Sequence, residues 1–110
     1  MKVLVAGEEL ALDARGYLLD GSRWSPAFAT TLAAADGIEL GPLHWELINF
    51  LRDYHQRFDL APPMRLLVRE FGQRFGPDKG SSRYLYRLFP DGPARQACRY
   101  AGLPKPVSCI

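Results

Sequence analysis

From Pro42 onward, large apolar side chains recur every three or four residues, which is the period of an α-helix with one buried face. The apolar positions of this period are Trp45, Ile48, Leu51, Tyr54 and Phe58. Prolines at positions 62 and 63 interrupt the pattern, because proline lacks the amide donor that a helix interior needs. This segment is the strongest predicted helix of the chain.

Four shorter segments have helical patterns between residues that typically start and stop helices. These predicted helices cover residues 26–36, 64–75, 83–89 and 93–101. Around Gly7, residues 3–12 predict two short strands and a turn, with 16–19 as a candidate third strand. The fold class is therefore expected to be α+β, with a small N-terminal sheet followed by helices.

At 110 residues, of which 47% are hydrophobic, the chain is expected to form one domain, residues 1–110, around a single core. No apolar run approaches the roughly 20 residues that span a bilayer, and the apolar start meets charged residues too soon for a signal peptide. We therefore expect a cytoplasmic protein without a membrane partner. In that reducing compartment, two cysteines favour redox or nucleophilic chemistry over a structural disulfide.

The last eight residues, 103–110, cannot form a helix, because alternate prolines lack amide donors and push their neighbours toward extended conformations. We expect them to form a flexible C-terminal arm that carries Cys109 as its penultimate residue. The seven residues from Gly102 to Cys109 span at most roughly 23 Å. The arm can project outward, or it can fold back and bring Cys109 to Cys98, and the pattern leaves both arrangements open.

Cys109 is the candidate nucleophile of the chain. Cations on the arm and on the preceding predicted helix favour its thiolate form, and a thiolate can attack a sulfane sulfur as it attacks a disulfide. Cys98 lies instead on a helix face of small residues, which is typical of an ordinary core position.

Charge is distributed unevenly between the two halves of the chain. Residues 1–60 hold 5 basic and 9 acidic side chains, whereas residues 61–110 hold 9 basic and 3 acidic ones. A basic half can attract acidic protein surfaces or nucleic acid, although a solvated helix face explains the same excess. The candidate partner-docking residues are Arg83, Arg87, Arg95, Arg99 and Lys105.

Neither a metal nor a cofactor is expected. His44 and His55 are eleven residues apart on one predicted helix, which separates them by about 16 Å, and the two cysteines lack metal-ligand spacing.

The helices predicted at 64–75 and 83–89 are compatible with a helix-turn-helix. The second of them has little polar surface for reading bases, so nucleic-acid binding is a weaker alternative.

Several longer motifs run through nearly the whole chain. They are EL at 39–40, HW at 44–45, PMR at 63–65, GSSRYLYRLFP at 80–90, GPARQA at 92–97, AGLPKP at 101–106 and the final CI. Together these motifs resemble the TusE/DsrC family of sulfur carriers, also called the gamma subunit family of dissimilatory sulfite reductase.

The resemblance implies an N-terminal β-hairpin packed on an orthogonal helical bundle with a mobile C-terminal arm. It also implies a sulfurtransferase that accepts sulfur as a persulfide on Cys109. In the TusE branch the sulfur comes from the TusBCD complex and goes to the MnmA thiouridylase, which forms 2-thiouridine at the tRNA wobble position. Such a carrier meets tRNA only indirectly.

In the DsrC branch the partner is the DsrAB sulfite reductase, and a second cysteine forms a disulfide or trisulfide with the penultimate one. Cys98 matches that second cysteine and is therefore a candidate resolving residue. We expect tRNA thiolation, because it is the more widespread use of the family, and sulfite reduction is the alternative.

Overall fold

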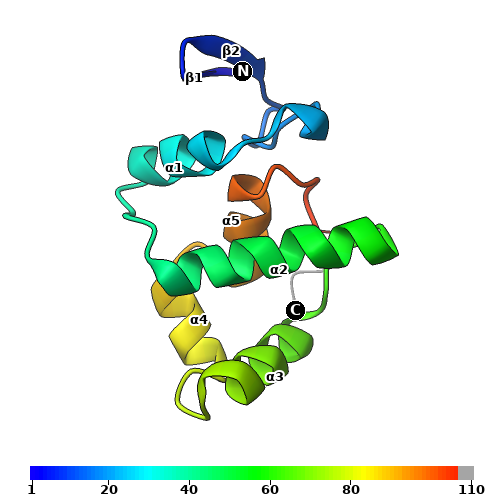
Figure 1. The fold of residues 1–110 in the computed structure, drawn as a ribbon. Helices are drawn as coiled ribbons and strands as arrows, with labels where there is room; N and C mark the ends of the chain where they lie inside the picture. The colour runs from blue at the N-terminus through cyan, green and yellow to red at the C-terminus, as the bar shows by residue number, and fades with distance from the viewer. Residues whose placement is uncertain (107–110) are drawn as a thin grey trace.

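The computed structural model describes residues 1–106 of the 110-residue chain, so Cys109 lies outside the described residues. Within residues 1–106, two strands lead into a short 3-10 helix and five α-helices (Figure 1). The elements are β1 (Lys2–Val5), β2 (Glu8–Ala11), the 3-10 helix Gly21–Arg23, α1 (Pro26–Ala35), α2 (Pro42–Phe58), α3 (Met64–Phe75), α4 (Ser82–Leu88) and α5 (Pro93–Tyr100). The α+β class and all five predicted helices are confirmed.

Strands β1 and β2 form an antiparallel hairpin in which Val3 lies opposite Leu10. The turn residues Ala6 and Gly7 both have positive φ, +50° and +83°, which suits the right-handed twist of a two-residue hairpin. Val5 and Leu10 are buried, and β1 contacts α1. The hairpin is thus attached to the helices through its apolar face.

The candidate third strand at 16–19 is wrong, because only one isolated bridge joins Leu12 to Leu18. Asp13 explains the difference, since its carboxylate accepts two backbone amides of the following turn, including that of Tyr17 at 2.9 Å. A side chain that captures amides in this way closes a tight turn and removes donors that a strand ladder would use.

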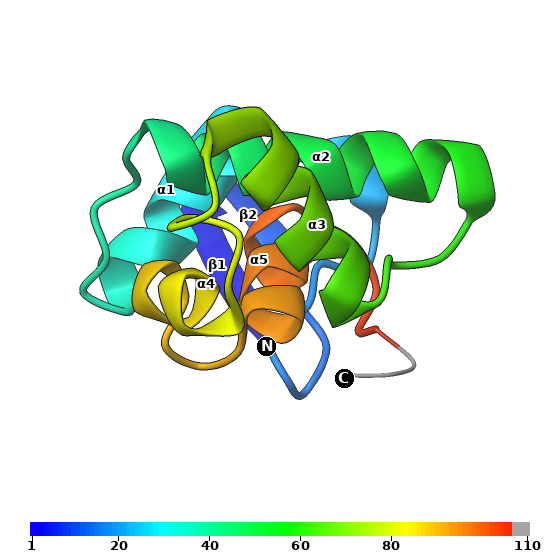
Figure 2. The ribbon, with the colours of Figure 1, turned by 90° about the horizontal axis from the view of Figure 1, so that it is seen from below.

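Helix α5 lies at the centre of the bundle and contacts α1, α2 and α4 (Figures 1 and 2). Its side chains Ala97, Cys98 and Tyr100 have no exposed surface.

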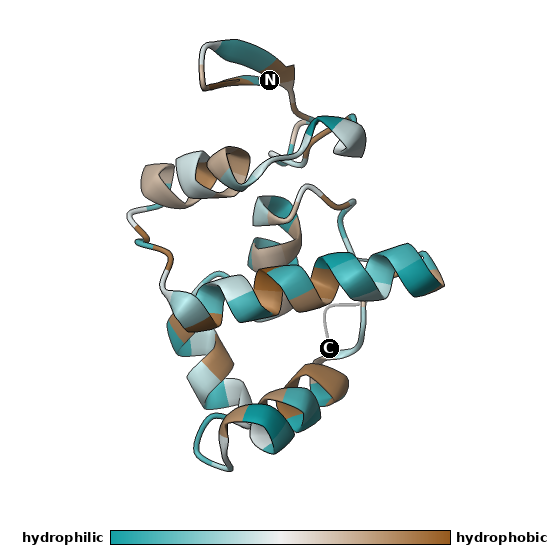
Figure 3. Cartoon of the chain, viewed as in Figure 1, coloured by the Kyte–Doolittle hydropathy of each residue, from teal (hydrophilic) through white to brown (hydrophobic). Residues whose placement is uncertain are grey.

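Figure 3 shows apolar and polar residues alternating along α2, as its predicted period requires. No helix within residues 1–106 is long and apolar enough to cross a membrane.

A buried tyrosine joins the end of α1 to α5. The Tyr100 hydroxyl donates to a carboxylate oxygen of Asp36 at 2.6 Å and accepts from the side-chain amide of Gln96 at 2.8 Å. Arg99 also binds the Asp36 carboxylate. Burial, reinforced by Asp36, raises the pKa of Tyr100 to about 12.

This pKa predicts a loss of stability at high pH. A tyrosine in the unfolded chain ionises near 10.0, whereas folded Tyr100 ionises at about 12, so folding favours the neutral hydroxyl. We expect the free energy of unfolding to fall as the pH rises from 10 toward 12, and to fall less steeply in Tyr100→Phe. Urea unfolding of both proteins across this range checks the prediction, and identical slopes would contradict it.

Candidate functional site

Helix α5 ends in a turn that reverses the chain. The Leu103 amide donates to the Cys98 carbonyl at 3.1 Å, the Gly102 amide donates to the Arg99 carbonyl at 3.3 Å, and Gly102 has φ +70°. This pair of hydrogen bonds is a Schellman motif. Leu103 and Pro106 are buried, so residues 103–106, the described part of the predicted arm, lie against the body of the protein.

Two side chains from distant parts of the chain hold this turn in place. The Trp24 indole donates to the Tyr100 carbonyl at 2.8 Å, and the Arg52 guanidinium donates to the Ala101 carbonyl at 2.7 Å. The same guanidinium lies 3.8 Å from the centre of the Trp24 ring, as in a cation–π pair. These contacts satisfy carbonyls that the end of α5 leaves without helical partners.

The clamp formed by Trp24 and Arg52 also fixes the residue that follows α5. A Cβ atom added to Gly102 would lie 2.5 Å from the Cδ1 atom of Trp24, so only glycine fits between the indole and the turn. Neither Trp24 nor Arg52 was predicted from the sequence to have this role. No local pattern marks them, because their carbonyl partners lie 76 and 49 positions further along the chain.

Beside this turn, a groove of about 490 Å³ lies between the described arm and the connection between α2 and α3. Cys98 lines the groove together with Pro104 to Pro106 of the arm and with residues 60–63 of the connection. Cys98 itself has no solvent-exposed surface. Its thiol is therefore closed to solvent in this structure.

The groove is also within reach of the predicted nucleophile. Cys109 follows Pro106 by three residues, which span at most about 11 Å. Because Pro106 lines the same groove as Cys98, the sequence keeps Cys109 within about 11 Å of a residue of that groove. The role of either cysteine in sulfur transfer remains a prediction.

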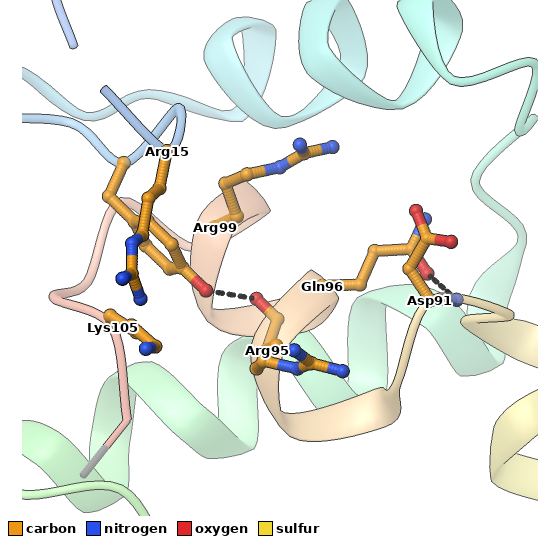
Figure 4. A pocket seen from close by; sticks show the side chains of 7 residues that line it. Arg15, Asp91, Arg95, Gln96, Arg99 and Lys105 are labelled. Carbon is orange, nitrogen blue, oxygen red and sulfur yellow. Dashed lines mark hydrogen bonds between the residues drawn. The ribbon is translucent and has the colours of Figure 1, made fainter. Parts of the chain in front are cut away.

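A second pocket, of about 200 Å³, lies where the turn after β2 meets α5 and the arm (Figure 4). It brings together three of the five predicted docking cations, Arg95, Arg99 and Lys105, and adds Arg15. Arg99 already forms an ion pair with Asp36, so it is less available to a partner protein than the other three cations. Arg15 was not predicted from the sequence, because it lies in the half of the chain with an acidic excess.

Arg83 and Arg87, the other two predicted docking residues, are exposed on α4 and do not line this pocket. The structure thus separates the predicted docking surface into two places. The docking role of α4 remains a prediction.

His44 is a structural residue that connects the start of α2 to the end of α4. Its Nδ1 atom accepts from the Gly41 amide at 3.0 Å, so Nε2 carries the proton that is donated to the Leu88 carbonyl at 3.0 Å. Burial lowers the pKa of His44, which favours this neutral form. Within residues 1–106, no group of three or more potential metal ligands is close enough to hold an ion.

Comparison with known proteins agrees with this arrangement. The family model for DsrC like proteins matches residues 4–110. A protein named sulfurtransferase TusE from Pectobacterium atrosepticum is 52% identical over 104 residues, which cover 94% of this chain and 95% of the relative. A protein of the same name from Escherichia coli (strain K12) is 49% identical over 108 residues, which cover 98% and 99%.

The fold has an experimental counterpart over its full length. The crystal structure of the oxidized gamma-subunit of the dissimilatory sulfite reductase (DsrC) from Archaeoglobus fulgidus superposes with a TM-score of 0.92, at 42% sequence identity and with 100% of both chains covered. The family model and these relatives each span nearly all of this sequence. The chain therefore belongs to the DsrC family.

Proposed function

We propose that this protein is a sulfur carrier that holds sulfur as a persulfide on Cys109 and passes it to a partner protein in a tRNA sulfur relay. The observation that carries the proposal is that relatives about half identical over nearly the whole chain are named sulfurtransferase TusE. The anchored turn after α5 supports it, because it gives the segment that bears Cys109 a fixed starting point.

The chemistry needs no cofactor. The Cys109 thiolate attacks the outer sulfur of a donor persulfide, the donor's sulfur–sulfur bond breaks, and the donor thiolate leaves. A thiolate of the acceptor then attacks the outer sulfur on Cys109, and the Cys109 thiolate leaves. Each step exchanges one sulfur–sulfur bond for another, so no external oxidant or reductant is required.

We propose a TusBCD-like complex as the donor and an MnmA-like thiouridylase as the acceptor, so that tRNA is met only indirectly and in the cytoplasm. A sulfur that enters two different active sites must sit on a thin segment. We propose that the C-terminal arm serves this purpose once residues 103–106 leave the body of the protein, and that its two prolines then limit the conformational entropy lost on docking.

A second candidate function is partnership with a DsrAB-type sulfite reductase, and the position of Cys98 in the groove favours it. There the Cys98 thiolate would attack the inner sulfur of a Cys109 persulfide. A disulfide between Cys98 and Cys109 would form, and hydrosulfide would leave. The burial of Cys98 suits such a resolving residue, because it limits the attack to a sulfur carried into the groove.

The two functions differ in whether the protein can supply sulfur for 2-thiouridine in a cell that thiolates tRNA. We expect the chain to restore 2-thiouridine in Escherichia coli lacking its own TusE, and we expect Cys109→Ser to restore none. Nucleoside analysis of total tRNA by mass spectrometry measures the result, with the E. coli protein as the positive control. If the folded protein accumulates without restoring 2-thiouridine, the proposed tRNA role is wrong and the sulfite reductase role is favoured.

A further inference from the structure

Three cations from separate parts of the chain surround the pocket of about 200 Å³ shown in Figure 4. Arg15 comes from the turn after β2, Arg95 from α5 and Lys105 from the arm. The turn is held rigidly, since the Asp13 carboxylate accepts the amides of Arg15 and Tyr17 at 2.8 and 2.9 Å. The Tyr17 hydroxyl in turn donates to the Arg95 carbonyl at 3.3 Å, which joins the turn to α5.

The charge of this pocket is not balanced within the described chain. Among residues 1–106, no carboxylate lies within ion-pair distance of Arg15, Arg95 or Lys105, whereas five other arginines and lysines each have a carboxylate partner. Among the described residues, Asp91 is the one carboxylate that lines the pocket. The net positive charge that lines the pocket would stabilise a negatively charged occupant.

The size of the pocket limits that occupant. Pockets for nucleotides, cofactors and similar ligands enclose about 300–1,000 Å³, which is more than this one offers. A volume of about 200 Å³ suits a single carboxylate or a small oxyanion. A guanidinium and an ammonium are both strong donors to such groups.

The position of the pocket selects between these occupants. Lys105 precedes Cys109 by four residues, which span at most about 14 Å. A protein that takes Cys109 into its active site therefore brings the rim of that site close to the pocket. We propose that the pocket of Arg15, Arg95 and Lys105 receives an acidic side chain from the proteins that exchange sulfur with Cys109. This inference rests on the proposed function and adds the docking contact.

The contact is tested on the whole chain with a hexaglutamate peptide as the probe, using amide chemical shifts in NMR titrations at low salt. We expect shifts centred on Arg15, Arg95 and Lys105, and an affinity about tenfold lower in Arg95→Glu. The matched control is Arg69→Glu, which reverses an exposed arginine on α3 that does not line the pocket, and there we expect a change below about twofold. Equal losses of peptide affinity in the two variants would show that the overall positive charge, and not the pocket, attracts the peptide. That result would overturn the proposal.

Two parallel probes decide the class of occupant. Inorganic phosphate that binds in the pocket at least as tightly as the peptide would make it a small-anion site, and an oligouridine that does so would make it a nucleic-acid contact. Either result overturns the proposal, as does the absence of peptide binding. Sulfur loading of the unmodified protein from inorganic polysulfide tests the proposed function separately, because that donor has no acidic side chain.

Discussion

Cys109→Ser is expected to abolish sulfur loading and to leave the fold intact. A serine hydroxyl cannot form the sulfur–sulfur bond that holds the cargo, so no intermediate remains. The buried core is built from residues between Val5 and Leu103, so the substitution removes nothing from it. Intact-mass measurement after incubation with polysulfide should show about 32 Da added per sulfur in the parent and no addition in the variant.

Cys98→Ala is the matched control for this experiment, because it removes the other thiol of the chain. We expect this variant to load sulfur at Cys109 and to lose any disulfide between the two positions. The buried thiol leaves only a small void, so the stability should fall by about 1 kcal/mol. Undiminished loading in Cys109→Ser, or loss of loading in Cys98→Ala, would reverse the assigned roles.

Gly102→Ala is expected to destabilise the protein by about 3 kcal/mol or more. The residue has φ +70°, and its Cβ would lie 2.5, 2.9 and 3.0 Å from three atoms of Trp24. Trp24 cannot easily move aside, because its indole donates to the Tyr100 carbonyl and stacks on Arg52. Relief of the collision would therefore require breaking the clamp that anchors the arm.

Gly37→Ala separates the collision from the backbone strain. Gly37 has a similar φ, +76°, but an added Cβ would meet nothing within 4 Å. Its substitution should therefore cost about 1 kcal/mol, which is the penalty for a side chain in this backbone conformation. Urea unfolding gives both values, and equal losses at Gly37 and Gly102 would show that Trp24 does not restrict the turn.

The helices were predictable because their signals are local. Ser25 and Ser81 accept the amides of Phe28 and Tyr84 three residues further on, at 3.3 and 3.1 Å, and prolines open three of the five helices. The predicted third strand is absent from the described residues, and the reason is also local. One aspartate side chain captured the amides that the strand would have used.

The clamp and the pocket lined by Arg15, Arg95 and Lys105 could not be predicted in the same way, because they depend on contacts between distant positions. Arg99 illustrates the point, since its charge made it a docking candidate. The structure pairs it with Asp36, which lies 63 positions earlier. Arg15 shows the converse, because only the folded chain brings it to Arg95 and Lys105. Residue type and spacing indicate which cations exist, and the fold decides which remain available.

The most direct test of the account is the location of the bound sulfur in the unmodified protein. Trypsin cleaves after Arg95 and Arg99 but not between Lys105 and Pro106, so Cys98 falls in peptide 96–99 and Cys109 in peptide 100–110. After loading from polysulfide and alkylation, we expect the additional 32 Da, about one sulfur atom, on peptide 100–110. The same mass on peptide 96–99, with peptide 100–110 unchanged, would contradict the assignment of Cys109 as the sulfur carrier.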